Sequence, residues 1–225
     1  MLFRSLTVVG VGACAALTGV LLGLAWMVVS GSSTGLWLTA RAAGLTSYLL
    51  LTLVTISGLV LSHPARHRLR WPNAAQRVRL HVSLTIFTLV FVVVHIVVLA
   101  LDPWAQVGWV GAVLPFGSAY RPLPVTLGLL SLWAGIITGL SAGLAGRVTG
   151  RFWLMLHRFS AAVWVLAWLH GVFAGRDTAS WMWMYAVTGI AVVTAAAWRY
   201  ASAGRGDRLR EVAESRTAKY AKEPV

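Results

Sequence analysis

Four of the six histidines in this 225-residue chain lie inside long apolar segments, where ionisable side chains are costly and usually have a partner or a function. They form two pairs of similar spacing. His81 and His95 are 14 residues apart, and His157 and His170 are 13 residues apart. On a helix these separations correspond to rises of about 21 Å and about 20 Å. Each segment therefore places one imidazole near each side of a membrane.

The two segments are predicted to cross the membrane in the same direction, so His81 lies level with His157, and His95 with His170. Two imidazoles on opposite sides of one iron are the axial ligands of a bis-histidine haem, so the spacing predicts two haem sites. Thirteen residues at 100° each leave the second side chain about 140° from the first. The second segment therefore needs tighter local winding, helix tilt or different rotamers.

Other interpretations of these histidines stay open. Transmembrane histidines form hydrogen bonds between helices, and they also carry protons or bind metal ions. A single zinc or iron site would need ligands that converge on one point, whereas these four form two levels about 20 Å apart. The remaining histidines, His63 and His67, lie among arginines between two apolar segments. They are expected to be solvated or lipid-facing polar residues.

The composition is that of a membrane protein. Hydrophobic residues make up 58% of the chain and charged residues 11%, whereas soluble domains carry about 25% charged residues. Six continuously apolar segments, each close to the roughly 20 residues of a spanning helix, predict an all-α integral membrane protein with a six-helix bundle in residues 1–200. A β-barrel would show short alternating segments instead. The predicted spans are residues 6–29, 41–62, 80–101, 123–145, 154–173 and 181–200.

The net charge of +13 reflects topology rather than nucleic-acid binding. Of the 19 Lys and Arg residues, only Arg41, Arg121 and Arg176 fall on one side of the six-span arrangement. Because cytoplasmic loops are rich in positive charge, both termini are predicted to be cytoplasmic. The outer loop at 102–122 is expected to lie in the interface or to cover the outer mouth of the bundle. Residues 201–225 form a basic tail that is expected to be disordered or weakly helical.

Other kinds of site have little support in the sequence. The one cysteine, Cys14, lies in an apolar segment, so no disulfide or cysteine-based metal site can form within the chain. Asp102 and Asp177 lie in separate outer loops, and no nucleophile–base arrangement favours hydrolysis. There is also no GxGxxG motif to hold a dinucleotide.

The histidine spacings resemble the ferric reductase-like transmembrane domain family. This superfamily includes the membrane part of NADPH oxidases and the haem subunit of bacterial methionine sulfoxide reductase systems. Three stretches add to the resemblance, which extends from about residue 36 to 200: ARAAGLTSYLLL at 40–51, VLPFGSAYRPLPVTLG at 113–128, and WLMLHRFS followed by WLHGVFAGRDT. The resemblance implies that His81 and His157 ligate an inner haem b and that His95 and His170 ligate an outer haem b. It also implies electron flow from the cytoplasmic to the outer face.

The resemblance further implies a role for Arg41 near the outer haem. A haem propionate attracts a bidentate cation, which a guanidinium supplies. Arg121 and Arg176 are the other outer candidates, and an ordinary interfacial anchor is the alternative for each of the three. The inner candidates are Arg77, Arg79 and Arg158.

Many relatives carry flavin and nicotinamide domains after the sixth helix, whereas this sequence continues for only about 25 residues. The expected function is therefore that of a di-haem b electron-transfer protein in a bacterial plasma membrane. Its donor would be a separate cytoplasmic flavoprotein, which would bind FAD or FMN and NAD(P)H, or a membrane quinol. Its outer acceptor would be ferric iron, oxygen, a quinone or a protein. The alternative is a haem-free transporter or assembly partner that uses the histidines structurally or as a proton relay, although the broken helices and inverted repeats typical of transporters are not evident.

Overall fold

The structure, a computed structural model, describes residues 35–66, 72–143 and 152–220. The first predicted span, at 6–29, and Cys14 lie outside these residues. Every regular element within the described residues is a helix, and five helical segments are long and apolar enough to cross a membrane. These are α2 (Gly35–Leu61), α3 (Ala74–Leu101), α5 (Pro122–Gly143), the broken helix α6 (Phe152–Arg158) with α7 (Ser160–Ala174), and the first part of α8 (Thr178–Tyr220).

The surfaces of these helices agree with a lipid environment. Large apolar side chains such as Val93, Leu140 and Ile190 are more than half exposed on the outside of the bundle. In water such a surface would be unfavourable, because monomeric soluble proteins rarely expose large contiguous apolar patches. Five such helices indicate that this is a multi-pass helical membrane protein.

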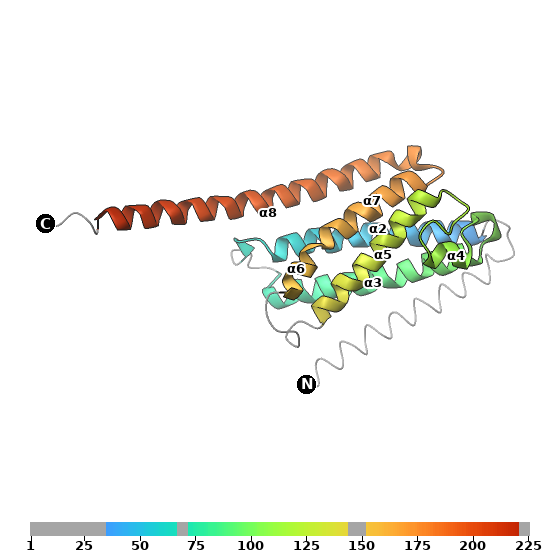
Figure 1. Ribbon diagram of the computed structural model, residues 1–225, viewed down its shortest axis with the longest axis horizontal. Coiled ribbons are helices and arrows are strands. Elements are labelled where there is room, and N and C mark those ends of the chain that lie inside the picture. The colour runs from blue at the N-terminus through green and yellow to red at the C-terminus, as the bar shows by residue number, and fades with distance from the viewer. Residues whose placement is uncertain (1–34, 67–71, 144–151, 221–225) are drawn as a thin grey trace, which may run out of the picture.

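The helices form a bundle in which consecutive spans are antiparallel (Figure 1). α2 packs along α3, α5 packs along α6 and α7, and α8 lies against α2 and α7. The short helices η2 (Pro103–Ala105) and α4 (Gly108–Val113) lie at one end of the bundle, and α6 lies at the other. The predicted outer loop is thus a folded element at the bundle end, and Trp104 and Trp109 on it are exposed.

Several helix boundaries differ from those expected from hydropathy, and two of them have a local explanation. α3 begins at Ala74 rather than residue 80 because Asn73 and Gln76 form a capping box. The Asn73 side chain accepts from the Gln76 amide, and the Gln76 side chain accepts from the Asn73 amide. α8 continues as a helix to Tyr220. The tail, which was expected to be either disordered or weakly helical, is therefore helical as far as this residue. The tail is rich in Ala, Arg, Glu and Lys, which favour helix.

Polar side chains tie α2, α7 and α8 together in the bundle interior. The Trp164 indole Nε1 donates to Thr52 Oγ1 at 2.9 Å, and the Tyr48 hydroxyl hydrogen-bonds with that of Thr188. Tyr48, Trp164 and Tyr185 also form the centre of the buried aromatic cluster. Because hydrocarbon offers no partner for a polar group, such bonds fix which helix faces meet.

Replacement of Thr52 by valine is expected to lower the free energy of unfolding in detergent micelles by about 1 kcal/mol. The Trp164 Nε1–H would stay buried without its acceptor, and interhelical bonds in membranes contribute about 0.6–2 kcal/mol. Thr55→Val is the matched control, because the Thr55 hydroxyl donates only within its own helix, to Leu51 O. Equal unfolding free energies for the two variants would contradict a role for the Thr52–Trp164 bond.

Candidate functional site

The four membrane histidines stand in two facing pairs. The ring centroids of His95 and His170 are 6.3 Å apart with an interplanar angle of 77°, and those of His81 and His157 are 6.2 Å apart at 76°. These are the pairs expected from the sequence. We call His95 with His170 the outer pair and His81 with His157 the inner pair, after the predicted topology.

The separation within each pair suits one shared metal ion. An imidazole nitrogen binds a metal ion at about 2.0–2.1 Å. With one ion between two imidazoles, and each ring centre roughly 1 Å behind its nitrogen, the centroids would be roughly 6 Å apart. A direct hydrogen bond between two imidazoles would bring the centroids to roughly 5 Å. Both pairs have the wider separation.

A break in the fifth span brings His157 and His170 onto one face. At Phe159, between α6 and α7, the Phe159 amide donates to Leu156 O and the Ala162 amide donates to Phe159 O. Both are three-residue bonds of the 3₁₀ type, which winds by about 120° and rises about 2.0 Å per residue. Over about four residues this adds about 80° and about 2 Å relative to an α-helix. Thirteen residues thus reach nearly the direction and height that 14 residues reach in α3.

The outer pair is held by main-chain carbonyls of the neighbouring helices. His95 Nδ1 lies 2.7 Å from Ala40 O of α2, and His170 Nδ1 lies 2.8 Å from Pro124 O of α5. A carbonyl oxygen only accepts, so each Nδ1 carries the hydrogen. In the neutral imidazole this leaves a lone pair on each Nε2, which is the tautomer that binds a metal ion.

His81 of the inner pair is fixed in the same tautomer by a hydroxyl. Its Nδ1 lies 2.8 Å from Ser57 Oγ. Because the Ser57 hydroxyl donates to Val54 O at 2.8 Å, the serine oxygen must accept from the imidazole. His81 therefore also keeps a lone pair on Nε2.

This tautomer pattern bears on the alternatives for the outer pair. His95 and His170 both present acceptors at Nε2, so they cannot hydrogen-bond to each other, whereas a shared cation would satisfy both lone pairs. A zinc ion would need about four protein ligands. Among the described residues, no group of three or more His, Cys, Asp or Glu side chains is placed to hold a metal ion. A haem iron needs only two protein ligands, because the macrocycle supplies its other four nitrogen ligands. The donor set therefore fits haem.

The helices that carry the facing histidines stand apart. α3 packs against α2 and α4, whereas α7 packs against α5, α2 and α8. Within the part of the chain that the structure describes, α3 makes no extensive contact with α7, which carries His170, or with α6, which carries His157. The two rings of each pair lie on opposite sides of this gap with centroids 6.2 or 6.3 Å apart, so both could hold one group between them.

Glycines let three of the histidine rings lie against a helix backbone, and the sequence prediction missed them. A β-carbon at Gly44 would lie 2.8 Å from His95 Nδ1, and one at Gly128 would lie 2.7 Å from His170 Nδ1. At Gly58 the distance to His81 Cε1 would be 3.3 Å. The available signal was the 14-residue step from Gly44 to Gly58, which repeats the step between the histidines of α3.

Arg41 follows Ala40, the residue whose carbonyl holds His95, so it lies at the level of the outer pair. Its guanidinium forms an ion pair with Asp177 and lies 5.1 Å from the Trp37 ring centroid and 5.9 Å from that of Trp181. The charge is thus held by a carboxylate and two aromatic faces.

The other outer arginines have structural contacts. Arg121 donates to Phe173 O at 2.6 Å and to Gly175 O at 3.1 Å, which satisfies carbonyls at the end of α7. Arg176 lies 5.2 Å from the centroid of the Tyr120 ring. Neither contact reaches a histidine.

The inner arginines differ in burial. Arg77 is buried and donates to Pro72 O and Arg66 O around the start of α3. Arg79 and Arg158 are exposed. Arg77 therefore has a structural role in the turn before α3, whereas the other two remain available at the surface.

His63 differs from the sequence prediction, which placed it in solvent or lipid. It is only 3% exposed, and its ring stacks on Trp198 of α8 with centroids 3.7 Å apart. Its Nδ1 accepts from the Ala65 amide at 3.0 Å. The prediction was wrong because the turn after α2 folds against α8, a contact that local polarity does not reveal. His67 lies outside the described residues.

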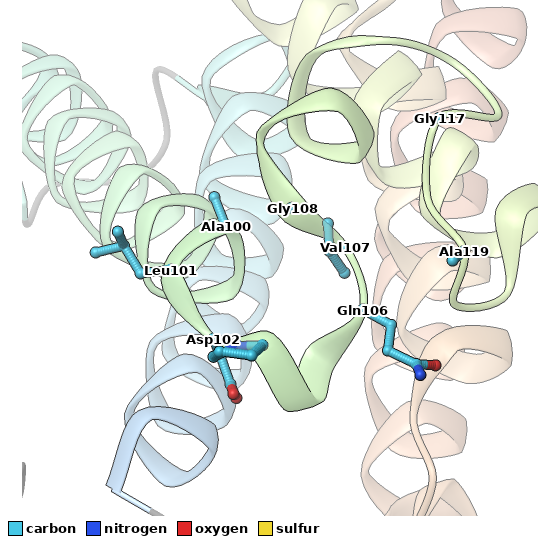
Figure 2. Close-up of a pocket in the computed structure, with 9 residues that line it drawn as sticks. Ala100, Leu101, Asp102, Gln106, Val107, Gly108, Gly117 and Ala119 are labelled. Carbon is cyan, nitrogen blue, oxygen red and sulfur yellow. The ribbon is translucent and has the colours of Figure 1, made fainter.

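A separate cavity of about 320 Å³ lies between the end of α3 and the loop that follows it (Figure 2). Asp102 lies on its wall, is 3% exposed, and caps η2 by accepting from the Trp104 amide. Gln106 and Gly108 on the same wall have positive φ angles that shape the turn between η2 and α4. None of the four paired histidines lines this cavity, so it is distinct from the two histidine sites.

The structure thus brings all four sequence-predicted histidines into the expected pairs, and the contacts of Arg41 are with Asp177, Trp37 and Trp181. It does not bring Arg121 or Arg176 into contact with the histidines. Comparisons with protein-family models, with curated proteins and with solved structures found no match to this chain.

Proposed function

We propose that this protein is a di-haem b transmembrane electron-transfer component, with His81 and His157 as axial ligands of an inner haem and His95 and His170 as those of an outer haem. One observation carries the proposal. Two imidazole pairs stand at the separation of bis-histidine ligands, and both members of the outer pair have Nε2 free to bind. Haem in such sites supplies one-electron redox chemistry.

The role of the chain itself is to orient the histidine ligands and to set the environment of the haems. The carbonyls of Ala40 and Pro124 orient the outer imidazoles and make them better electron donors to a metal ion. Arg41, which follows Ala40, is the proposed partner of an outer propionate, which would take the place of Asp177 in the ion pair.

The proposal extends to topology and partners. Six spans with both termini in the cytoplasm of a bacterium would direct the inner pair toward the cytoplasm and the outer pair toward the outside. A cytoplasmic flavoprotein with FAD or FMN and NAD(P)H, or a membrane quinol, would reduce the inner site. The outer acceptor would be ferric iron, oxygen, a quinone or a protein.

Purified protein, expressed with ample haem supply, is expected to contain about two haems b per chain. The measurement is a reduced-minus-oxidised spectrum combined with quantitation of the extracted haem. A colourless preparation that remains folded would overturn the proposal. It would favour a haem-free transporter or assembly partner with structural histidines.

A further inference from the structure

The four paired histidines are not held alike. Three of them have a hydrogen-bond acceptor at Nδ1, on α2 or α5. His157 is the exception, because its Nδ1 is buried and has no hydrogen-bond partner within the part of the chain that the structure describes. Its nearest ring neighbour other than His81 is Trp153, with centroids 6.2 Å apart.

The packing of α5 explains why His157 lacks an anchor. Gly128 of α5 lies beside His170, and Gly135 lies beside Val163, with a β-carbon distance of 3.5 Å. α5 and the α6–α7 span are antiparallel, so a step of seven residues forward in α5 matches a step of seven residues back in the other span. The next step places position 142 of α5 close to the level of His157. Position 142 is also one 14-residue step beyond Gly128, the same step that separates the two anchoring glycines of α2.

Position 142 is an alanine, so the fourth glycine of the pattern is missing. At the other three positions an added β-carbon would lie 2.7 to 3.3 Å from a histidine ring. By this register, the Ala142 methyl group takes the place that the other three positions leave open for a histidine ring. The carbonyl in the corresponding position, that of Thr138, accepts no bond from His157 Nδ1.

We propose that His157 is the exchangeable ligand of the inner site, and this rests on the proposed function. An imidazole whose Nδ1–H is bound to an acceptor is fixed in orientation and is a stronger ligand, and losing such a partner typically weakens metal binding about 10–100-fold. Without that partner the His157 ring turns away from the metal more readily. A small neutral ligand such as carbon monoxide then takes the place of Nε2, with no change in electron count. The outer haem keeps both of its histidine ligands, because His95 and His170 are anchored, and it does not bind the added ligand.

The test uses the haem-loaded full chain, reduced with dithionite and titrated with carbon monoxide. Carbon monoxide is expected to change the spectrum of about half of the haem. Ala142→Gly is expected to lower this carbon monoxide affinity at least about 10-fold, because the His157 ring gains the Thr138 carbonyl. Ala134→Gly is the matched control, since it introduces the same helix-weakening glycine in α5 away from both histidine levels.

The mirror variant is Gly128→Ala, which gives the outer site the methyl group that the inner site already has. It is expected to make the second half of the haem react with carbon monoxide. Wild-type protein that binds two haems but does not react with carbon monoxide would overturn the proposal. So would an unchanged titration in both Ala142→Gly and Gly128→Ala. Protein that contains no haem at all would instead overturn the proposed function itself, which separates the two failures.

Discussion

Replacement of His170 by alanine is expected to halve the haem content, from about two haems b per chain to about one. Under the proposed function, the variant would leave His95 as a lone ligand, because alanine has no donor to complete the outer pair. The inner pair lies about two-thirds of the membrane thickness away and keeps both of its imidazoles. Quantitation of extracted haem, together with the reduced-minus-oxidised spectrum of the purified variant, measures the change.

His63→Ala is the matched control for this experiment. His63 is buried but stacks on Trp198 rather than on another imidazole, so its loss is expected to leave two haems in place. His157→Ala is expected to remove the inner haem and preserve the outer one. A His170→Ala variant with an unchanged spectrum would contradict ligation by this residue. Equal haem loss in His63→Ala would attribute the effect to general destabilisation.

Replacement of Gly44 by alanine is expected to release the outer haem about 10–100-fold more readily without unfolding the protein. In a helix, alanine is more stable than glycine by about 1 kcal/mol, so the backbone gains from the change. The new β-carbon, however, would lie 2.8 Å from Nδ1 and Cε1 of His95, and the ring must leave the Ala40 carbonyl to avoid it. The rate of haem transfer to an added apoglobin measures the effect.

The comparison variant is Gly139→Ala. A β-carbon at Gly139 on α5 would meet no atom within 4 Å, so the variant gains the same helix propensity without moving a histidine. Haem transfer at the same rate from Gly44→Ala and Gly139→Ala would show that the carbonyl anchor does not contribute to binding. Unfolding measurements on both variants test whether the expected gain in helix stability is present.

The apolar spans and the histidine pairs could be predicted from the sequence because both depend on regular spacing along helices. Hydrophobic length sets the spans, and a separation of about four turns returns a side chain to the same face at the other side of the membrane. The spacing of His157 and His170 departs from this rule. The sequence indicated that some adjustment was needed, but the position of the 3₁₀ turn at Phe159 required the structure.

The features that the sequence did not predict depend on contacts between distant segments. The burial of His63 requires Trp198 of α8, and the role of Gly44 requires His95 of α3. The ion pair that holds Arg41 forms with Asp177, which follows α7. In each case the residue type was visible in the sequence, whereas its partner was determined by how the helices pack.

The anchors of the histidines have a consequence for biogenesis. His95 and His81 are oriented by α2, the helix that directly precedes their own, and His170 is oriented by α5 in the same way. Each helical hairpin therefore orients its own imidazoles, with His157 as the exception. Under the proposed function, the outer haem would therefore join two half-sites, each of which its own hairpin has already aligned.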